Sequence, residues 1–223
     1  MKNIIKMVAS RLPHRVQYEI RRYRYARQIA RDNFSAAEPD YDRLGDFVTE
    51  GDCVIDLGAN IGNYTKKLSD LVGPAGRVIA VEPVPETMSL LAANAGLFEN
   101  QNVTLLNVAA SDSVREVGME LPQFDVGLNN FYMAHVSEKA DFSVLAIPLD
   151  TLGISERVSL IKVDVEGHEK EAIAGMRRLI ERDLPVMIVE TGSPDNIELL
   201  ANRKYFLGIV QLNFEASEEV VGK

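Results

Sequence analysis

A short apolar run that ends in a glycine-bearing turn is the feature that most constrains the fold of this chain. Cys53–Leu57 is predicted to be a buried strand, the turn carries Gly58 and Gly62, and a helical segment follows to about Val72. Glycine has no Cβ, so the chain can turn tightly there and a small molecule can approach the main chain. The N–H groups at the start of the helix face the same point. This order predicts a ligand site at a strand end of an α/β domain.

The rest of the chain repeats the alternation of short apolar runs and helical segments. Such alternation predicts an α/β domain with a mostly parallel central sheet and helices on both faces, a Rossmann-like architecture. Further strands are predicted at 77–81, 103–108, 160–165 and 186–189, with a last one within 205–214. Helices are predicted over 85–98, 169–182 and 195–201, and the tail 215–223 is expected to be loose.

Two segments do not follow this alternation of apolar runs and helical segments. Residues 114–147 contain Gly, Asn and Ser without a sustained helical period, which predicts an extra hairpin or a lid, since long insertions of this kind are usually functional or mobile. Residues 1–40 are predicted to be a basic helical extension, ahead of a main domain over 41–223.

The charge distribution separates these two parts. Residues 1–34 carry nine Lys or Arg against Glu19 and Asp32, a net +7, so the remainder of the chain holds −16 within the total of −9. An acidic body is a poor nucleic-acid binder. The basic helix could face a phosphate-bearing substrate or an anionic membrane surface. It could equally be an exposed helix whose apolar side packs on the body.

Composition narrows the class of protein. Apolar residues make up 46% and charged residues 26% of the 223, which is ordinary for a soluble globular protein. No uncharged stretch approaches the ~20 apolar residues that a membrane span needs. Cys53 is the single cysteine, so an internal disulfide is excluded and a reducing, cytoplasmic location is expected. One cysteine and three histidines provide no zinc-binding spacing, and a homo-oligomer remains possible.

The glycine turn also indicates which ligand it binds. A dinucleotide fingerprint, G-x-G-x-x-G, has a glycine where the pyrophosphate touches the backbone, and this turn has Asn60 there. Asp56 adds a negative charge before Gly58, with Ala59 between Gly58 and Asn60. Both departures disfavour an anionic pyrophosphate and suit a cationic sulfonium that carries an ammonium group. The turn also lacks the lysine of a phosphate-binding loop.

Acidic and polar residues at the next strand ends extend this site. Glu82 follows Gly62 by 20 residues, the spacing at which a carboxylate accepts both ribose hydroxyls of an adenosine-containing cofactor. The alternative for Glu82 is a solvated strand end. Ser111 and Asp112 come after the third strand and could meet the adenine amino group, or they could form an ordinary polar turn.

A second cluster of ionisable residues follows the fourth predicted strand. Asp164, Glu166 and His168 lie where that strand ends and a helix begins. The crevice of an open α/β sheet lies beyond the carboxyl ends of its strands, so this cluster and the glycine turn should face one site. Any of the three could remove a proton from an acceptor, and a carboxylate could instead hold a divalent cation, although nothing in the sequence supports a metal. The alternative is capping of the helix.

Five blocks of the sequence resemble the FkbM family of S-adenosylmethionine-dependent methyltransferases. They are VIDLGANIGNYT, VIAVEPVPET, IPLDTL, IKVDVEGHEKEAIAGM and VMIVE, in that order over roughly residues 50–192. The resemblance implies a seven-stranded class I methyltransferase fold and O-methylation of a sugar, glycan or polyketide-type metabolite. It assigns S-adenosyl-L-methionine to Asp56, Gly58, Asn60, Gly62 and Glu82, with Asp164 and Glu166 lining the reaction side. The insertion around 127–130 and the short region after Gly192 depart from the family pattern.

Two other functions remain open at this point. One is N-methylation of a small amine or a nucleic-acid base, although the chain lacks the D/N-P-P-Y/F/W run of the nucleic-acid enzymes and its body is acidic. The other is a noncatalytic cofactor-binding scaffold. Intact Asp56, Glu82 and Asp164 argue against the loss of a cofactor site.

Overall fold

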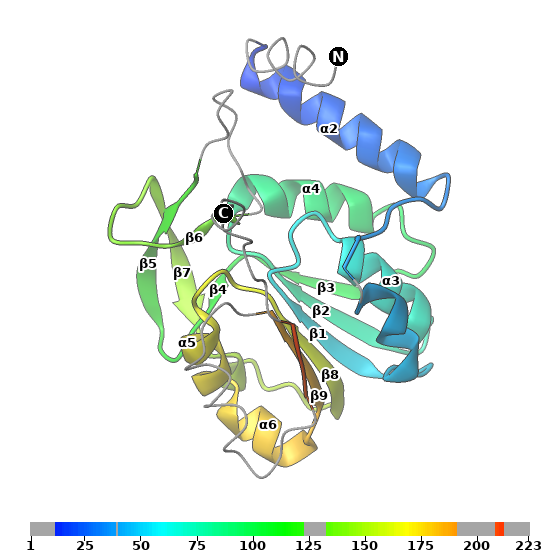
Figure 1. Cartoon of the computed structure of the whole chain (residues 1–223), viewed down its shortest axis with the longest axis vertical. Helices are drawn as coiled ribbons and strands as arrows, with labels where there is room; N and C mark the ends of the chain where they lie inside the picture. Colours follow the sequence, from blue (N-terminus) through cyan, green and yellow to red (C-terminus); the bar gives the residue numbers. More distant parts are fainter. Residues whose placement is uncertain (1–11, 39, 123–132, 191–207, 212–223) are drawn as a thin grey trace, which may run out of the picture.

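A parallel sheet forms the centre of the molecule (Figure 1). The structure is a computed structural model that describes residues 12–38, 40–122, 133–190 and 208–211. In these parts the sheet has six strands in the order β10-β9-β8-β1-β2-β3, all paired in parallel. The strands are β1 (Cys53–Leu57), β2 (Arg77–Val81), β3 (Val103–Leu106), β8 (Val158–Val163), β9 (Val186–Glu190) and β10 (Gly208–Gln211).

The central strand β1 is buried along its whole length, with β2 on one side and β8 on the other. Parallel strands covered on both faces read as continuous apolar runs, which is why Cys53–Leu57 was recognisable in the sequence. Asp56 interrupts the run. It lies opposite Ala80 of β2 and opposite Lys162 of β8.

Helices cover both faces of this sheet, as the sequence predicts. Alternate residues of β1 point to opposite faces. Ile55 packs with α5 (Glu169–Ala174) and α6 (Arg177–Asp183), whereas Val54 packs with α3 (Asn63–Val72) and the short 3₁₀ helix η1 (Tyr41–Asp46). A fourth helix, α4 (Pro85–Ala95), packs on Ala80 of β2, on the same face as α3. The Rossmann-like α/β fold is therefore confirmed.

Several predicted boundaries need correction. The helix expected over 85–98 ends at Ala95, and the strand expected over 103–108 ends at Leu106. The strand expected at 160–165 spans Val158–Val163. Its earlier end matters for the site, because Asp164 then lies on the loop beyond the strand rather than within it.

The single helix expected over 169–182 is wrong, because α5 and α6 are separate helices. Gly175 lies between them, and a Cβ built on it would be 1.8 Å from the carbonyl oxygen of Ser111. The break therefore coincides with a close backbone approach between segments distant in the sequence. Such an approach is visible only once the chain is folded.

The insertion at 114–147 forms most of a second, smaller sheet in the order β4-β7-β5-β6. Its strands are β4 (Ala109–Ala110), β5 (Arg115–Glu120), β6 (His135–Val136) and β7 (Phe142–Ile147). β5 pairs antiparallel with both β6 and β7, an arrangement that agrees with the extra hairpin, whereas the alternative of a lid stays a prediction. The departure around 127–130 lies outside the described residues.

The basic segment near the N-terminus contains a helix, α2 (His14–Ile29), which lies beside α4 (Figure 1). Glu86 of α4 forms ion pairs with His14 and Arg21, and the hydroxyl groups of Tyr18 and Ser89 are 2.8 Å apart. The division at residue 40 stays a prediction. Among the described helices, none has both the length and the apolar character needed to cross a membrane.

Predictions for the C-terminal region are tested only at β10. This strand falls within 205–214 and extends the sheet beside β9. The helix expected at 195–201 and the tail at 215–223 lie outside the described residues. The resemblance implies seven strands, and the described parts contain six in the main sheet.

Candidate active site

A pocket of about 610 Å³, partly open to solvent, lies at the carboxyl ends of β1, β2 and β8. The turn after β1 contributes Gly58 and Asn60, and the end of β2 contributes Glu82. The loop after β8 contributes Asp164, Glu166 and His168. The two clusters predicted from separate parts of the sequence therefore face one pocket, as expected for the crevice of an open α/β sheet.

The two glycines of the turn both have positive φ, +73° at Gly58 and +96° at Gly62. A Cβ at Gly58 would lie 1.7 Å from the carbonyl oxygen of Asp164, and one at Gly62 would lie 2.6 Å from Leu91 Cδ1. The sequence argument expected these gaps to admit a small molecule. Atoms of the protein itself occupy them, so the glycines let the turn pack on the β8 loop and on α4.

Replacing Gly58 with alanine is expected to destabilise the fold by about 3 kcal/mol or more, because a Cβ at this position overlaps a backbone carbonyl. Gly153 is a matched control, since it also has positive φ, +62°, but has no atom within 4 Å of an added Cβ. Gly153→Ala should cost only about 1 kcal/mol, from backbone strain alone. Urea unfolding measures the free energy of unfolding of both variants. Equal losses would contradict the role of the Asp164 contact.

Glu82 connects the glycine turn to the loop after β2. Its Oε2 accepts a hydrogen bond from the backbone N–H of Asn60, and its Oε1 accepts one from Val84, each at 2.9 Å. The side chain is 5% exposed, and this burial raises its pKa to about 7, although the two N–H groups act in the opposite direction. Glu82 is therefore a buried carboxylate at the pocket wall, fixed by two backbone hydrogen bonds, and not a solvated strand end.

Asn60 is the second polar group of the turn. It has a positive φ of +49°, a conformation uncommon for residues other than glycine. Its buried side-chain Oδ1 has no hydrogen-bond partner within the described parts of the chain. A buried acceptor without a partner is costly, so this oxygen is available for a donor on a ligand.

Asp56 lies behind the pocket and does not line it. The carboxylate is fully buried, and its Oδ2 accepts a hydrogen bond of 2.6 Å from Thr65 Oγ1 on α3. Burial raises the pKa of Asp56, while the positive charge of Lys162 acts in the opposite direction. The other oxygen, Oδ1, has no hydrogen-bond partner among the described residues.

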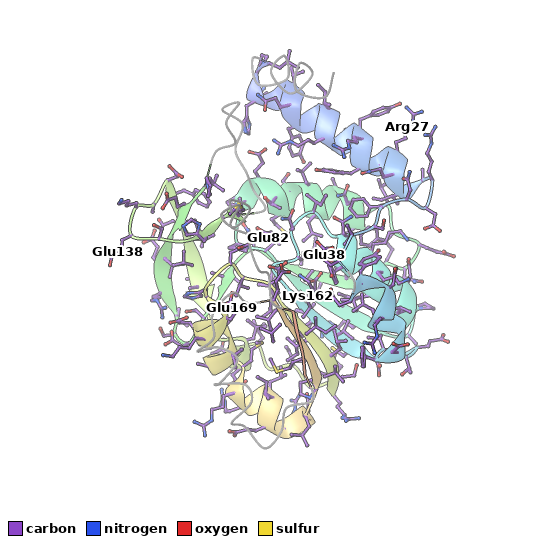
Figure 2. The ribbon with its side chains drawn as sticks, in the orientation of Figure 1. Arg27, Glu38, Glu82, Glu138, Lys162 and Glu169 are labelled. Atoms are coloured by element: carbon purple, nitrogen blue, oxygen red, sulfur yellow. The ribbon has the colours of Figure 1, made fainter. Side chains whose placement is uncertain are left out.

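Lys162 is a buried cation whose importance the sequence analysis missed. Its ammonium group pairs with Asp164 at 2.9 Å and lies 4.4 Å from the ring centre of Tyr64. Burial alone would lower its pKa, but Asp164 and Asp56 raise it above the usual range, so Lys162 is charged. The available signal was a lysine within an apolar strand. Figure 2 shows Glu82 and Lys162 at the centre of the molecule.

Glu166 stands on the loop after β8 with a positive φ of +47°. Its side chain is exposed at the pocket, and partial desolvation together with Asp164 and Glu190 raises its pKa to about 7. Strained backbone at a non-glycine residue is concentrated at functional sites. A carboxylate with this pKa can take up a proton near neutral pH.

His168 is more constrained than Glu166. It is 9% exposed, its Nε2 lies 3.1 Å from Ser111 Oγ, and its Nδ1 lies 3.7 Å from a carboxylate oxygen of Glu171. Burial lowers the pKa of His168 below its usual value, so the ring is neutral at neutral pH. One ring nitrogen is thus engaged with Ser111, and His168 is among the residues that line the pocket.

Some of the predicted site residues are not brought into the pocket lining. Ala59 and Gly62 pack against the protein, and Ser111 is fully buried beside His168. Asp112 is exposed and accepts hydrogen bonds from Arg115 and Ser113. The proposed adenine contact of Ser111 and Asp112 therefore stays a prediction without a matching pocket position.

The second sheet supplies an apolar wall that the sequence analysis did not assign. Met119 of β5, Val136 of β6 and Ala110 of β4 line the same pocket as the carboxylates. The sequence signal for this strand was the apolar residues at alternate positions, Val117 and Met119, which the structure shows buried. The position of β5 beside the pocket depends on its pairing with β6 and β7, which are distant in the sequence.

A metal site finds no support in the side-chain arrangement. Among the residues that the structure describes, no three His, Cys, Asp or Glu side chains are grouped so that they could hold a metal ion. Asp164, one of the acidic residues of the pocket, is instead paired with Lys162.

Comparisons with known proteins relate this arrangement to a family. The methyltransferase FkbM domain matches residues 56–213. A curated relative, the hexuronic acid methyltransferase AglP of Haloferax volcanii, is 28% identical over 181 residues, covering 78% of this chain and 71% of its own.

Two solved structures are also similar. Methyltransferase FkbM from Methylobacillus flagellatus shares 19% identity with a TM-score of 0.44, covering 82% of this chain and 47% of its own. A precorrin-6y C5,15-methyltransferase from Geobacter metallireducens shares 16% identity with a TM-score of 0.43, covering 74% and 68%. The chain thus spans about half the length of the first structure. Because the family match extends over more than half of the sequence, the chain belongs to the FkbM family of methyltransferases.

Proposed function

We propose that this methyltransferase uses S-adenosyl-L-methionine to methylate a hydroxyl group of a sugar-type acceptor. The observation that carries the proposal is the excess of carboxylates around the pocket. Glu82, Asp164 and Glu166 line it, Asp56 lies behind it, and the buried cation beside them is Lys162. Opposite charge nearby favours the ionised form of a carboxylate, so such a site favours a cationic ligand.

The residues present fit this cofactor. S-adenosyl-L-methionine carries a sulfonium and an ammonium group, and when bound it supplies an electrophilic methyl group. Glu82 would accept hydrogen bonds from the ribose hydroxyls, in keeping with its position after β2. Asn60 Oδ1, buried and without a partner in the described parts, would accept a further donor from the ligand. Asp164 would face the part of the cofactor that carries the sulfonium and ammonium groups.

A dinucleotide fits the same pocket less well. Its pyrophosphate would bring negative charge beside Asp164 and Glu166, two carboxylates of the pocket lining. Asn60 also occupies the position where the fingerprint has its middle glycine. Like charges at short range raise the cost of binding. The electrostatics of the pocket therefore favour the sulfonium cofactor.

Glu166 is the side chain best suited to accept the proton of an acceptor hydroxyl. Asp164 is paired with Lys162, and His168 is held by Ser111. Glu166 is exposed at the pocket, and its pKa of about 7 keeps a useful fraction ionised near neutral pH. A hydroxyl is a weak acid, so its attack on a methyl group benefits from a general base.

The acceptor class is proposed from the relative and from the wall of the pocket. The relative AglP is named as a hexuronic acid methyltransferase. The apolar wall of Met119, Val136 and Ala110 provides a surface on which the C–H face of a sugar ring can pack. We therefore expect a saccharide that contains a hexuronic acid, methylated at a ring hydroxyl.

A transfer assay with methyl-labelled S-adenosyl-L-methionine tests this function. The panel comprises oligosaccharides that contain glucuronic or galacturonic acid, the matched neutral oligosaccharides, glucosamine and single-stranded DNA. Label on the uronic acid oligosaccharide that survives mild alkali supports an ether on a hydroxyl, whereas alkali-labile label identifies a methyl ester. Label on glucosamine or DNA would identify an N-methyltransferase. Cofactor binding without transfer to any of these acceptors would contradict the proposed acceptor class.

A further inference from the structure

The outer face of α2 is fixed in position by contacts on its inner face. Tyr25 and Phe34 pack in a cluster with Ile61 and Leu90, and Glu86 of α4 pairs with His14 and Arg21. These contacts use one side of the helix along most of its length. The opposite side is consequently presented outward, away from α4 (Figure 1).

The outward side carries three exposed apolar residues. Val16, Ile20 and Tyr23 are 42%, 50% and 69% exposed. Their spacing of four and three residues places them in one line along the helix surface. Scattered apolar residues on a surface are ordinary, but a line of three on one helix face is a contiguous apolar stripe.

Arginines surround this apolar stripe. At 100° per residue, Arg27 continues the stripe, Arg24 lies on one flank, and Arg15 and Arg22 lie on the other. All four of these residues are exposed. The single acidic residue of the helix is Glu19, which pairs with Arg22 at 3.0 Å. The outer face of α2 thus combines exposed aliphatic and aromatic groups with a clear positive charge.

We propose that the outer face of α2 binds the surface of a bilayer that contains anionic lipids. An interfacial helix inserts an apolar stripe at the headgroup boundary while the flanking basic residues meet the lipid phosphates. Tyr23, the most exposed of the three, has the amphipathic ring that favours this boundary. The line of Val16 and Ile20 favours a bilayer over nucleic acid, whose phosphate backbone offers no partner for aliphatic side chains.

The charge of the remaining chain supports a specific orientation. Residues 35–223 carry −16, so the body is repelled by an anionic surface while the N-terminal segment is attracted. Contact with the bilayer is then confined to α2. A bilayer on the outer face of α2 would therefore lie beyond α2, on the side of this helix that faces away from α4 (Figure 1).

Vesicle co-sedimentation of the full chain tests this proposal. We expect binding to vesicles of phosphatidylcholine with phosphatidylglycerol, no binding to phosphatidylcholine alone, and weaker binding as salt is raised from 0.01 to 0.15 M, since the Debye length falls from about 30 to about 8 Å. Each arginine near an anionic surface contributes about fivefold to the partition coefficient. R22Q/R27Q should therefore lower it roughly 25-fold.

Matched variants distinguish binding by the outer face of α2 from a general effect of exposed arginines or exposed apolar residues elsewhere on the protein. R177Q/R178Q removes two exposed arginines of α6, of which Arg177 pairs with Glu181 much as Arg22 pairs with Glu19, and should leave binding unchanged. V16S/I20S/Y23S should abolish binding, whereas L97S/V114S, exposed apolar residues outside α2, should not. Circular dichroism verifies that each variant is folded.

Two outcomes would overturn the proposal. One is the absence of binding to anionic vesicles at 0.01 M salt, and the other is binding that both α2 variants retain. Binding to single-stranded DNA that V16S/I20S/Y23S leaves intact would assign the arginines to a nucleic-acid partner instead. Because no cofactor or acceptor is present in this experiment, either result leaves the proposed methyl transfer untouched.

Discussion

Substitution of Glu82 by glutamine is expected to lower the affinity for S-adenosyl-L-methionine about 100-fold or more. Glu82 would make charge-assisted hydrogen bonds to both ribose hydroxyls, each contributing about 1.5–3 kcal/mol. The amide of glutamine also cannot accept from both Asn60 and Val84, whose N–H groups bond the two carboxylate oxygens. Titration calorimetry measures the affinity, and the thermal shift at a fixed cofactor concentration should fall with it.

A matched control separates this effect from a general loss of acidic charge. Glu181 is an exposed glutamate of α6 that pairs with Arg177, outside the pocket. Glu181→Gln should bind the cofactor as the native protein does. Both variants should retain the native circular dichroism spectrum. Unchanged affinity in folded Glu82→Gln would contradict the ribose role of this residue.

Substitution of Glu166 by glutamine is expected to lower kcat at least about 100-fold while the affinity for the cofactor is retained, because a general base acts on the chemical step. At saturating cofactor, where the titration of Glu82 does not contribute, kcat/KM for the acceptor should rise with pH through about 7 in the native enzyme, since the Glu166 carboxylate must be ionised to accept a proton. Glu166→Gln should lack this rise. Initial rates across the pH range, measured on the acceptor that the transfer assay identifies, provide the test.

His168 provides the competing assignment. Its ring is held by Ser111, and burial keeps its pKa below the usual value, so His168→Asn should leave the rise near pH 7 in place. If the rise persists in Glu166→Gln but vanishes in His168→Asn, the histidine is the proton acceptor. If both variants keep full turnover, neither residue serves as the base.

The parts of the fold that depend on local pattern could be predicted from the sequence. β1 and β2 begin and end where the apolar runs predict, because each run is mostly apolar and is bounded by turn residues. Gly62 and Pro85 mark the starts of α3 and α4 through their backbone preferences. The meeting of the glycine turn and the β8 loop followed from strand order in a parallel sheet.

Features that depend on contacts between distant segments could not be predicted in this way. The separation of α5 from α6 coincides with the carbonyl of Ser111 beside Gly175, 64 positions apart in the sequence. The apolar wall depends on the pairing of β5 with β7. The burial of Lys162 depends on Asp56 lying opposite it in β1, which no pattern within β8 reveals. The location of the site was thus predicted from the sequence, whereas the contacts among its side chains were not.

The register of β4 with β7 has a consequence for how acceptor preference can change in this protein. Ala110 lies opposite Ile147, so the segment that carries Met119 and Val136 of the apolar wall leaves and rejoins the body at neighbouring points. Exchange of a segment whose ends already meet adds little loop-closure entropy, whatever its length. The glycine turn, Glu82 and the β8 loop all lie outside this segment. Exchange of this segment is therefore expected to replace Met119 and Val136 of the pocket lining while Glu82, Asp164 and Glu166 stay in place.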